Sequence, residues 1–151
     1  MIINTRLVER DDSKDIWLWR NDEDTRHQST NQDLISLENH ESWFLKVLEN
    51  NRNLIYISLS DKKEKIGMTR FDFNKDKNKA TVSINLNPLY RGMGIGPMIL
   101  QSAIDIFRLD YKINLEATIR KNNMPSIKCF KKCGFVLDTD SGKFSYFTNN
   151  I

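Results

Sequence analysis

The stretch 83–107 constrains the fold most, because a short strand, a glycine-rich turn and an amphipathic helix follow one another there without a break. The glycines at 92, 94 and 96 can take positive φ and expose backbone N–H groups with no Cβ in the way. Pro97 suits the first turn of a helix, where its missing N–H would have had no partner. Behind it, one helical stripe is apolar and predicts anchoring to a core: Ile99, Leu100, Ala103, Ile104 and Phe107.

The beginning of this helix is predicted to bind an anion. The first N–H donors of a helix have no intrahelical acceptor, and a glycine-rich turn leaves them accessible. The turn lacks the G-x-G-x-x-G spacing of dinucleotide-binding loops and the Gly-Lys-Ser/Thr of a P-loop. A phosphate-rich ligand is therefore the first hypothesis, and a merely structural turn is the alternative.

Length and charge limit the class of protein to which the chain can belong. A chain of 151 residues predicts one domain, 1–151, able to fold without metals or disulfides. Its net charge of +3 comes from interleaved charges without a long block of one sign, so a nucleic-acid partner is not indicated. The sequence shows no apolar signal region and no run long enough to span a bilayer, so we expect a cytoplasmic protein without a membrane partner.

The two cysteines, Cys129 and Cys133, lie four residues apart in a helical pattern. This spacing matches neither a CxxC redox motif nor a zinc site. We expect two reduced core thiols and no metal.

The remaining elements follow from periodicity, caps and breakers. We expect an α+β fold with a mixed, mostly antiparallel sheet flanked by helices on both faces. The polar segment 21–32 is expected to be irregular. The predicted elements are a strand in 2–9, a helix after Asp11–Ser13, a helix capped by Ser36, a meander of 54–59, 66–73 and 80–86, a strand at 113–119, a helix at 124–133 and a hairpin of 135–137 with 144–147.

Two motifs resemble those of the GCN5-related N-acetyltransferases (GNAT). Arg91-x-x-Gly94-x-Gly96, after a strand and a turn, resembles motif A, whose loop holds the pyrophosphate of coenzyme A. The segment 123–135 resembles the motif Asn-x-x-Ser/Ala-Ile-x-x-Tyr-x-Lys-x-Gly-Phe. Two motifs in the correct order identify the chain as a member of this superfamily, which implies its acyl-CoA N-acyltransferase fold, acetyl-CoA as cofactor and N-acetyltransferase activity.

The resemblance also implies a cofactor site. The backbones of Ile84 and Leu86 would pair with the pantetheine arm, as in strand addition. Arg91 is either an added charge or a solvated turn residue, and Asn123 would both cap its helix and contact the cofactor arm. The expected cofactor-binding residues are Ile84, Leu86, Arg91, Gly92, Met93, Gly94, Ile95, Gly96, Pro97, Asn123, Ser126 and Phe130.

Direct attack of an amine on the thioester needs a base, an oxyanion donor and an acid. The family's acid is a tyrosine, and Phe130 at that position cannot donate a proton; water, Ser126 and Tyr90 are the alternatives. The N–H of Leu86 is the expected oxyanion donor. Candidate bases are Glu116, Thr118 and His40, although a histidine among aromatic residues is also explained as a structural residue.

Three stretches of the first half, 17–26, 35–44 and 67–72, resemble bacterial acetyltransferases of the pseudaminic-acid pathway, and more loosely ribosomal-protein N-acetyltransferases. This implies a small-molecule amine acceptor, a UDP-linked amino sugar, whose diphosphate suits a planar guanidinium. Core packing is the alternative for Trp19. The expected acceptor-binding residues are Trp19, Arg20, Asn21, Met68 and Arg70.

Two other functions stay open, as does the choice between a monomer and a homodimer. A protein N-terminal or lysine acetyltransferase would use the same cofactor site with a cationic peptide. A non-catalytic acyl-CoA-binding module would explain the missing tyrosine at Phe130.

Overall fold

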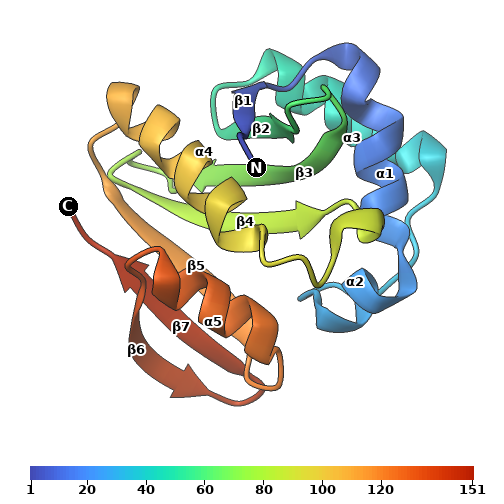
Figure 1. Cartoon of the computed structure of the whole chain (residues 1–151). Coiled ribbons are helices and arrows are strands. Elements are labelled where there is room, and N and C mark those ends of the chain that lie inside the picture. The colour runs from blue at the N-terminus through green and yellow to red at the C-terminus, as the bar shows by residue number, and fades with distance from the viewer.

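The computed structural model describes residues 1–151 as one seven-stranded sheet in the order β1-β2-β3-β4-β5-β7-β6, with helices on both faces (Figure 1). Only the β4–β5 pair is parallel. The expected α+β class and flanking helices are confirmed. The strands are β1 (Asn4–Leu7), β2 (Asn53–Leu59), β3 (Lys65–Phe73), β4 (Lys79–Leu86), β5 (Asn114–Arg120), β6 (Val136–Ser141) and β7 (Phe144–Asn149). The helices are α1 (Ser13–Asn21), α2 (Glu23–Gln28), α3 (Leu37–Glu49), α4 (Gly96–Asp110) and α5 (Met124–Lys132), with 3₁₀ turns at Arg10–Asp12 and Pro88–Tyr90.

The larger core lies between α4, α5 and one face of the sheet. The predicted apolar stripe of α4 is buried over its whole length. At its centre the Phe107 ring stacks on Phe71 with centroids 4.1 Å apart. Burial of this stripe fixes α4 against the sheet and leaves its first turn at the end of β4 (Figure 1).

A smaller core lies under α1 and α3 on the opposite face of β2 and β3. These two helices cover only that part of the sheet. On the same face, four side chains of β5 and β7 stay half-buried: Glu116, Thr118, Tyr146 and Thr148.

The strands β4 and β5 pair only at their first residues, Lys79 to Thr81 with Asn114 to Glu116, and then diverge (Figure 1). The N–H of Asn87 donates to the Ile66 carbonyl on the β3 side at 2.9 Å. Because successive strand residues direct their backbone groups to opposite sides, Leu86 and Ile84 direct theirs away from β3. The end of β4 therefore presents an unpaired edge, at the two residues that the sequence predicts to hold the cofactor arm.

One sequence expectation of the fold is wrong: Glu23–Gln28, expected to be irregular, forms α2. Asp22 caps it by accepting from the Thr25 N–H at 3.2 Å, and acidic residues occupy its first turn. The helix buries no residue, so it has no apolar stripe by which periodicity could have found it. None of the helices has the length and apolar character needed to cross a bilayer.

Candidate active site

The loop of residues 91–96, named the cofactor loop for the role that the sequence predicts, presents unpaired backbone donors at the positive end of α4. Gly92 and Gly94 take φ of 73° and 72°, and a Cβ at either position would meet open space. None of the amides from Gly92 to Gly96 donates a hydrogen bond within the chain, and Ile95, the N-cap of α4, supplies no side-chain cap. Such a row of free N–H groups at a helix start suits a diphosphate.

Asn123 lies at the start of α5, where its side-chain oxygen accepts from the Ser126 N–H at 3.3 Å. The expected cap is therefore present, and contact of Asn123 with the cofactor arm stays a prediction. Together the unpaired edge of β4, the cofactor loop and this helix start fit an elongated carrier with an amide-containing arm and a diphosphate.

Phe130 supplies no hydroxyl at the position of the family's acid. The Phe130 ring is 2% exposed and packs edge-on against Phe135 at 5.0 Å, so it belongs to the core. The Tyr90 hydroxyl is bound to the Glu64 carboxylate. Ser126, in the first turn of α5, keeps a half-buried side chain.

The three candidate bases lie in different surroundings. His40 is fully buried, with its Nε2 atom 2.9 Å from the Ser13 carbonyl oxygen. Burial lowers the pKa of His40, and its contacts are those of a structural residue. Glu116 and Thr118 instead line a hollow of about 290 Å³ on the uncovered face of β5 and β7, where Glu116 pairs with Lys79 at 2.9 Å.

Of the five expected acceptor residues, three serve the fold. Trp19 and Met68 are 5% and 3% exposed in the core under α1 and α3. The Asn21 side chain brackets the backbone of Ile35, donating to its carbonyl at 2.6 Å and accepting from its N–H at 3.0 Å. Core packing, the stated alternative for Trp19, is what the structure shows.

The other two, Arg20 and Arg70, meet at Trp43. Their guanidinium carbons lie 5.4 and 5.6 Å from the centroid of the Trp43 ring. Arg70 pairs with Asp72 at 3.0 Å, whereas Arg20 makes no ion pair and donates no hydrogen bond within the chain. Burial and the neighbouring charge of Arg70 lower the pKa of Arg20. Sequence reasoning missed the role of Trp43, because its helical spacing is that of a core residue.

Arg91 lies in the cofactor loop, but its guanidinium contacts α2. It donates to the carboxylates of Asp22 and Asp24 and to the Thr25 hydroxyl. Nothing in the sequence pairs these residues, which lie more than sixty positions apart.

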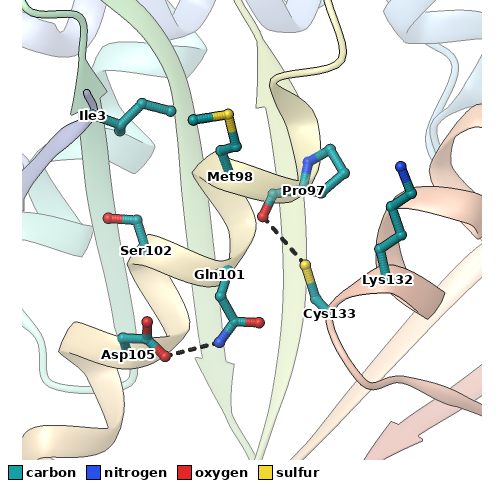
Figure 2. Close-up of a pocket in the computed structure, with 8 residues that line it drawn as sticks. All are labelled: Ile3, Pro97, Met98, Gln101, Ser102, Asp105, Lys132 and Cys133. Atoms are coloured by element: carbon teal, nitrogen blue, oxygen red, sulfur yellow. Dashed lines mark hydrogen bonds between the residues drawn. The ribbon is translucent and has the colours of Figure 1, made fainter. Parts of the chain in front are cut away.

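A groove of about 650 Å³ begins at the first turn of α4 and follows its outer face. Figure 2 shows Pro97 and Met98 between Ile3 on one side and Lys132 on the other. Lys132 is the cation among the residues that line the groove. The Cys133 thiol donates to the Pro97 carbonyl at 3.3 Å. Both cysteines are free and buried, as predicted, and burial raises the pKa of Cys133 to about 11.

Solved structures of two N-acetyltransferases share this fold. The spermidine N-acetyltransferase of Vibrio cholerae, in complex with CoA and spermine, superposes with a TM-score of 0.85 at 17% identity over 97% of this chain and 92% of that one. The aminoglycoside acetyltransferase AAC(6')-Ib, with ribostamycin and coenzyme A, gives a TM-score of 0.85 at 17% identity over 99% and 94% of the two chains.

Sequence comparison identifies the family. The uncharacterized N-acetyltransferase YfmK of Bacillus subtilis (strain 168) is 26% identical over 131 residues, which cover 86% of this chain and 83% of YfmK. The family model described as "Acetyltransferase (GNAT) domain" matches residues 3–136. Because that match spans both motifs and most of the chain, the protein belongs to the GNAT family of acetyl-CoA-dependent N-acetyltransferases.

Proposed function

We propose that this enzyme acetylates a primary amine on an anionic acceptor, and that its substrate class is a nucleotide-linked amino sugar. The observation that carries the proposal is the half-buried Arg20 guanidinium, which lies beside Arg70 on Trp43 without a carboxylate partner. Removing a cation from water without a counter-charge is unfavourable. A diphosphate would supply that charge in the planar, bidentate geometry that guanidinium groups favour.

The position of the arginines relative to β4 supports this acceptor. Arg70 pairs with Ser83 across β3 and β4, and Leu86 follows three residues later on β4. That separation is about 10 Å along a strand. A diphosphate at the arginines would therefore leave the amine of its attached sugar within reach of a thioester at Leu86.

The chemistry would then use the cofactor and one backbone group of the chain. Acetyl-CoA supplies the acetyl group as an activated thioester. The Leu86 N–H would donate to the carbonyl oxygen, where negative charge develops. Glu116 lies too far away to take the ammonium proton directly, because it pairs with Thr81, five residues or about 16 Å before Leu86 on β4, and its carboxylate contacts Lys79. No hydroxyl is needed at Phe130, because a thiolate with a pKa of about 8.5 is a tolerable leaving group.

A thiol-release screen tests the acceptor class. The purified enzyme with acetyl-CoA would be assayed with UDP-linked amino sugars, the same sugars without the nucleotide, spermidine, an aminoglycoside and short peptides. We expect the highest kcat/KM for a nucleotide-linked sugar. Turnover on spermidine or on a peptide amine, with none on the nucleotide sugars, would contradict the proposal and favour a cationic acceptor.

Arg20→Ala is expected to raise the KM for the nucleotide-linked sugar about tenfold and to leave the KM for acetyl-CoA unchanged. The estimate follows from the loss of one charge-assisted contact of about 1.5 kcal/mol. Steady-state kinetics with each substrate varied would measure it. Arg52→Ala, which removes an exposed arginine before β2, is the matched control. Equal acceptor KM values in the two variants would refute this role of Arg20.

A further inference from the structure

Arg91 connects the cofactor loop to the part of the chain that leads to the acceptor. Its guanidinium contacts Asp22, Asp24 and Thr25, all at the start of α2. We propose that Arg91 is a positioning residue for the acceptor, which holds α2 to the cofactor loop and thereby keeps Arg20 in place. The inference depends on the proposed function for one point, the binding of the acceptor at Arg20.

Polar contacts hold α2 in place, since the helix buries no side chain. Arg91 holds its first residues, and the Arg120 Nε donates to the carbonyl of Ser29, its C-cap, at 2.9 Å. Arg91 follows β4 and Arg120 ends β5, so α2 bridges the two strands that diverge. An element that is held by a few hydrogen bonds and buries no side chain is readily loosened when one of them is lost.

A loosened α2 would displace Arg20 through the junction between α1 and α2. Asp22 ends α1, where its N–H donates to the Leu18 carbonyl at 3.1 Å, and it also caps α2. The Asn21 carbonyl, between Arg20 and Asp22, accepts from a side chain of α2 at 3.2 Å. A shift of Asp22 therefore moves the last turn of α1.

Both terminal nitrogens of the Arg91 guanidinium contact residues at the start of α2. One terminal nitrogen donates to both Asp22 and Thr25, and the other lies 3.5 Å from Asp24. The unpaired amides of the loop are sufficient donors for a diphosphate. Loss of Arg91 should therefore raise the KM of the acceptor more than it weakens the binding of the cofactor. Its position in motif A would suggest the opposite.

The test combines Arg91→Gln with Asp22→Asn, because asparagine still caps a helix while it removes the ion pair. We expect each variant to raise the KM of the nucleotide-linked amino sugar about fivefold, and the double variant to raise it no further. Amide hydrogen exchange in residues 23–28 should become about tenfold faster in each. The Kd of desulfo-CoA, measured by calorimetry, should stay within about twofold of the wild-type value. Glu23→Gln is the control and should change none of these, because Glu23 is an exposed carboxylate in the same first turn of α2 without an ion pair or a side-chain hydrogen bond.

Two results would overturn the inference. One is a tenfold weaker Kd for desulfo-CoA in Arg91→Gln, with hydrogen exchange in α2 unchanged. The other is additive effects of the two substitutions, which would show that they act separately. The exchange and desulfo-CoA measurements need no acceptor, so they decide this inference even if no nucleotide sugar is acetylated and the proposed function fails.

Discussion

Gly94→Ala is expected to weaken the binding of desulfo-CoA by ten- to a hundredfold. Gly94 has φ of 72°, a conformation that costs an L-residue with a Cβ about 1–2 kcal/mol. Nothing lies within 4 Å of a Cβ built there, so no packing contact is lost. Relaxation of the backbone toward negative φ would turn the neighbouring amides away from one another, and the loop would lose its converging donors.

Gly142→Ala is the matched control for this prediction. Gly142 lies in the turn between β6 and β7 with φ of 59°, and its Cβ position is also open. Both variants therefore carry a similar backbone penalty, visible as a similar fall in Tm. Isothermal titration of desulfo-CoA into each protein separates a loss of cofactor binding at the loop from a general loss of stability. An equal Kd in the two variants would contradict the assigned role of the cofactor loop.

Asp12→Asn should lower the free energy of unfolding by about 3 kcal/mol at pH 7. The Asp12 side chain is 1% exposed, and its carboxylate accepts from Arg6 at 2.8 and 3.0 Å and from Lys65 at 2.8 Å. It also accepts from the Glu9 N–H at 2.7 Å. These contacts join β1, β3 and the turn before α1. Urea unfolding followed by circular dichroism would measure the loss, with the exposed neighbour substitution Asp11→Asn as the control.

The Asp12 carboxylate also makes the stability of the protein depend on pH. Burial alone would raise the pKa of Asp12, but the hydrogen bonds from Arg6 and Lys65 lower it from 3.8 to about 2. A carboxylate with a lowered folded-state pKa stabilises the protein above its unfolded pKa and loses that contribution as the pH falls. About 2 kcal/mol should therefore be lost between pH 5 and about pH 2, and Asp12→Asn should flatten this part of the profile. An equally steep profile in the variant would show that other groups govern acid unfolding.

Local chemistry explains which parts of the structure the sequence predicts. The cofactor loop and the caps at Ser36 and Asn123 depend on residues a few positions apart, and the structure contains all of these elements. The apolar stripe of α4 likewise follows from one period within one helix. Such features need no knowledge of tertiary contacts.

The parts that sequence reasoning missed depend on distant contacts. The arrangement of Arg20 and Arg70 on Trp43 joins three elements, and the tie from Arg91 to Asp22 spans much of the chain. Trp19, expected at the acceptor, is covered when α1 meets α3. Periodicity indicates that a side chain faces a core or a solvent, but not which side chains of other elements it meets there.

We infer that the backbone amides of the cofactor loop hold the diphosphate of coenzyme A while the edge of β4 holds its arm. Titration of ¹⁵N-labelled protein with desulfo-CoA, followed through its amide resonances, tests this residue by residue. We predict the largest shifts at the amides of Gly92, Gly94, Gly96 and Leu86. Binding that leaves these four amides unshifted and perturbs another surface would contradict the claim.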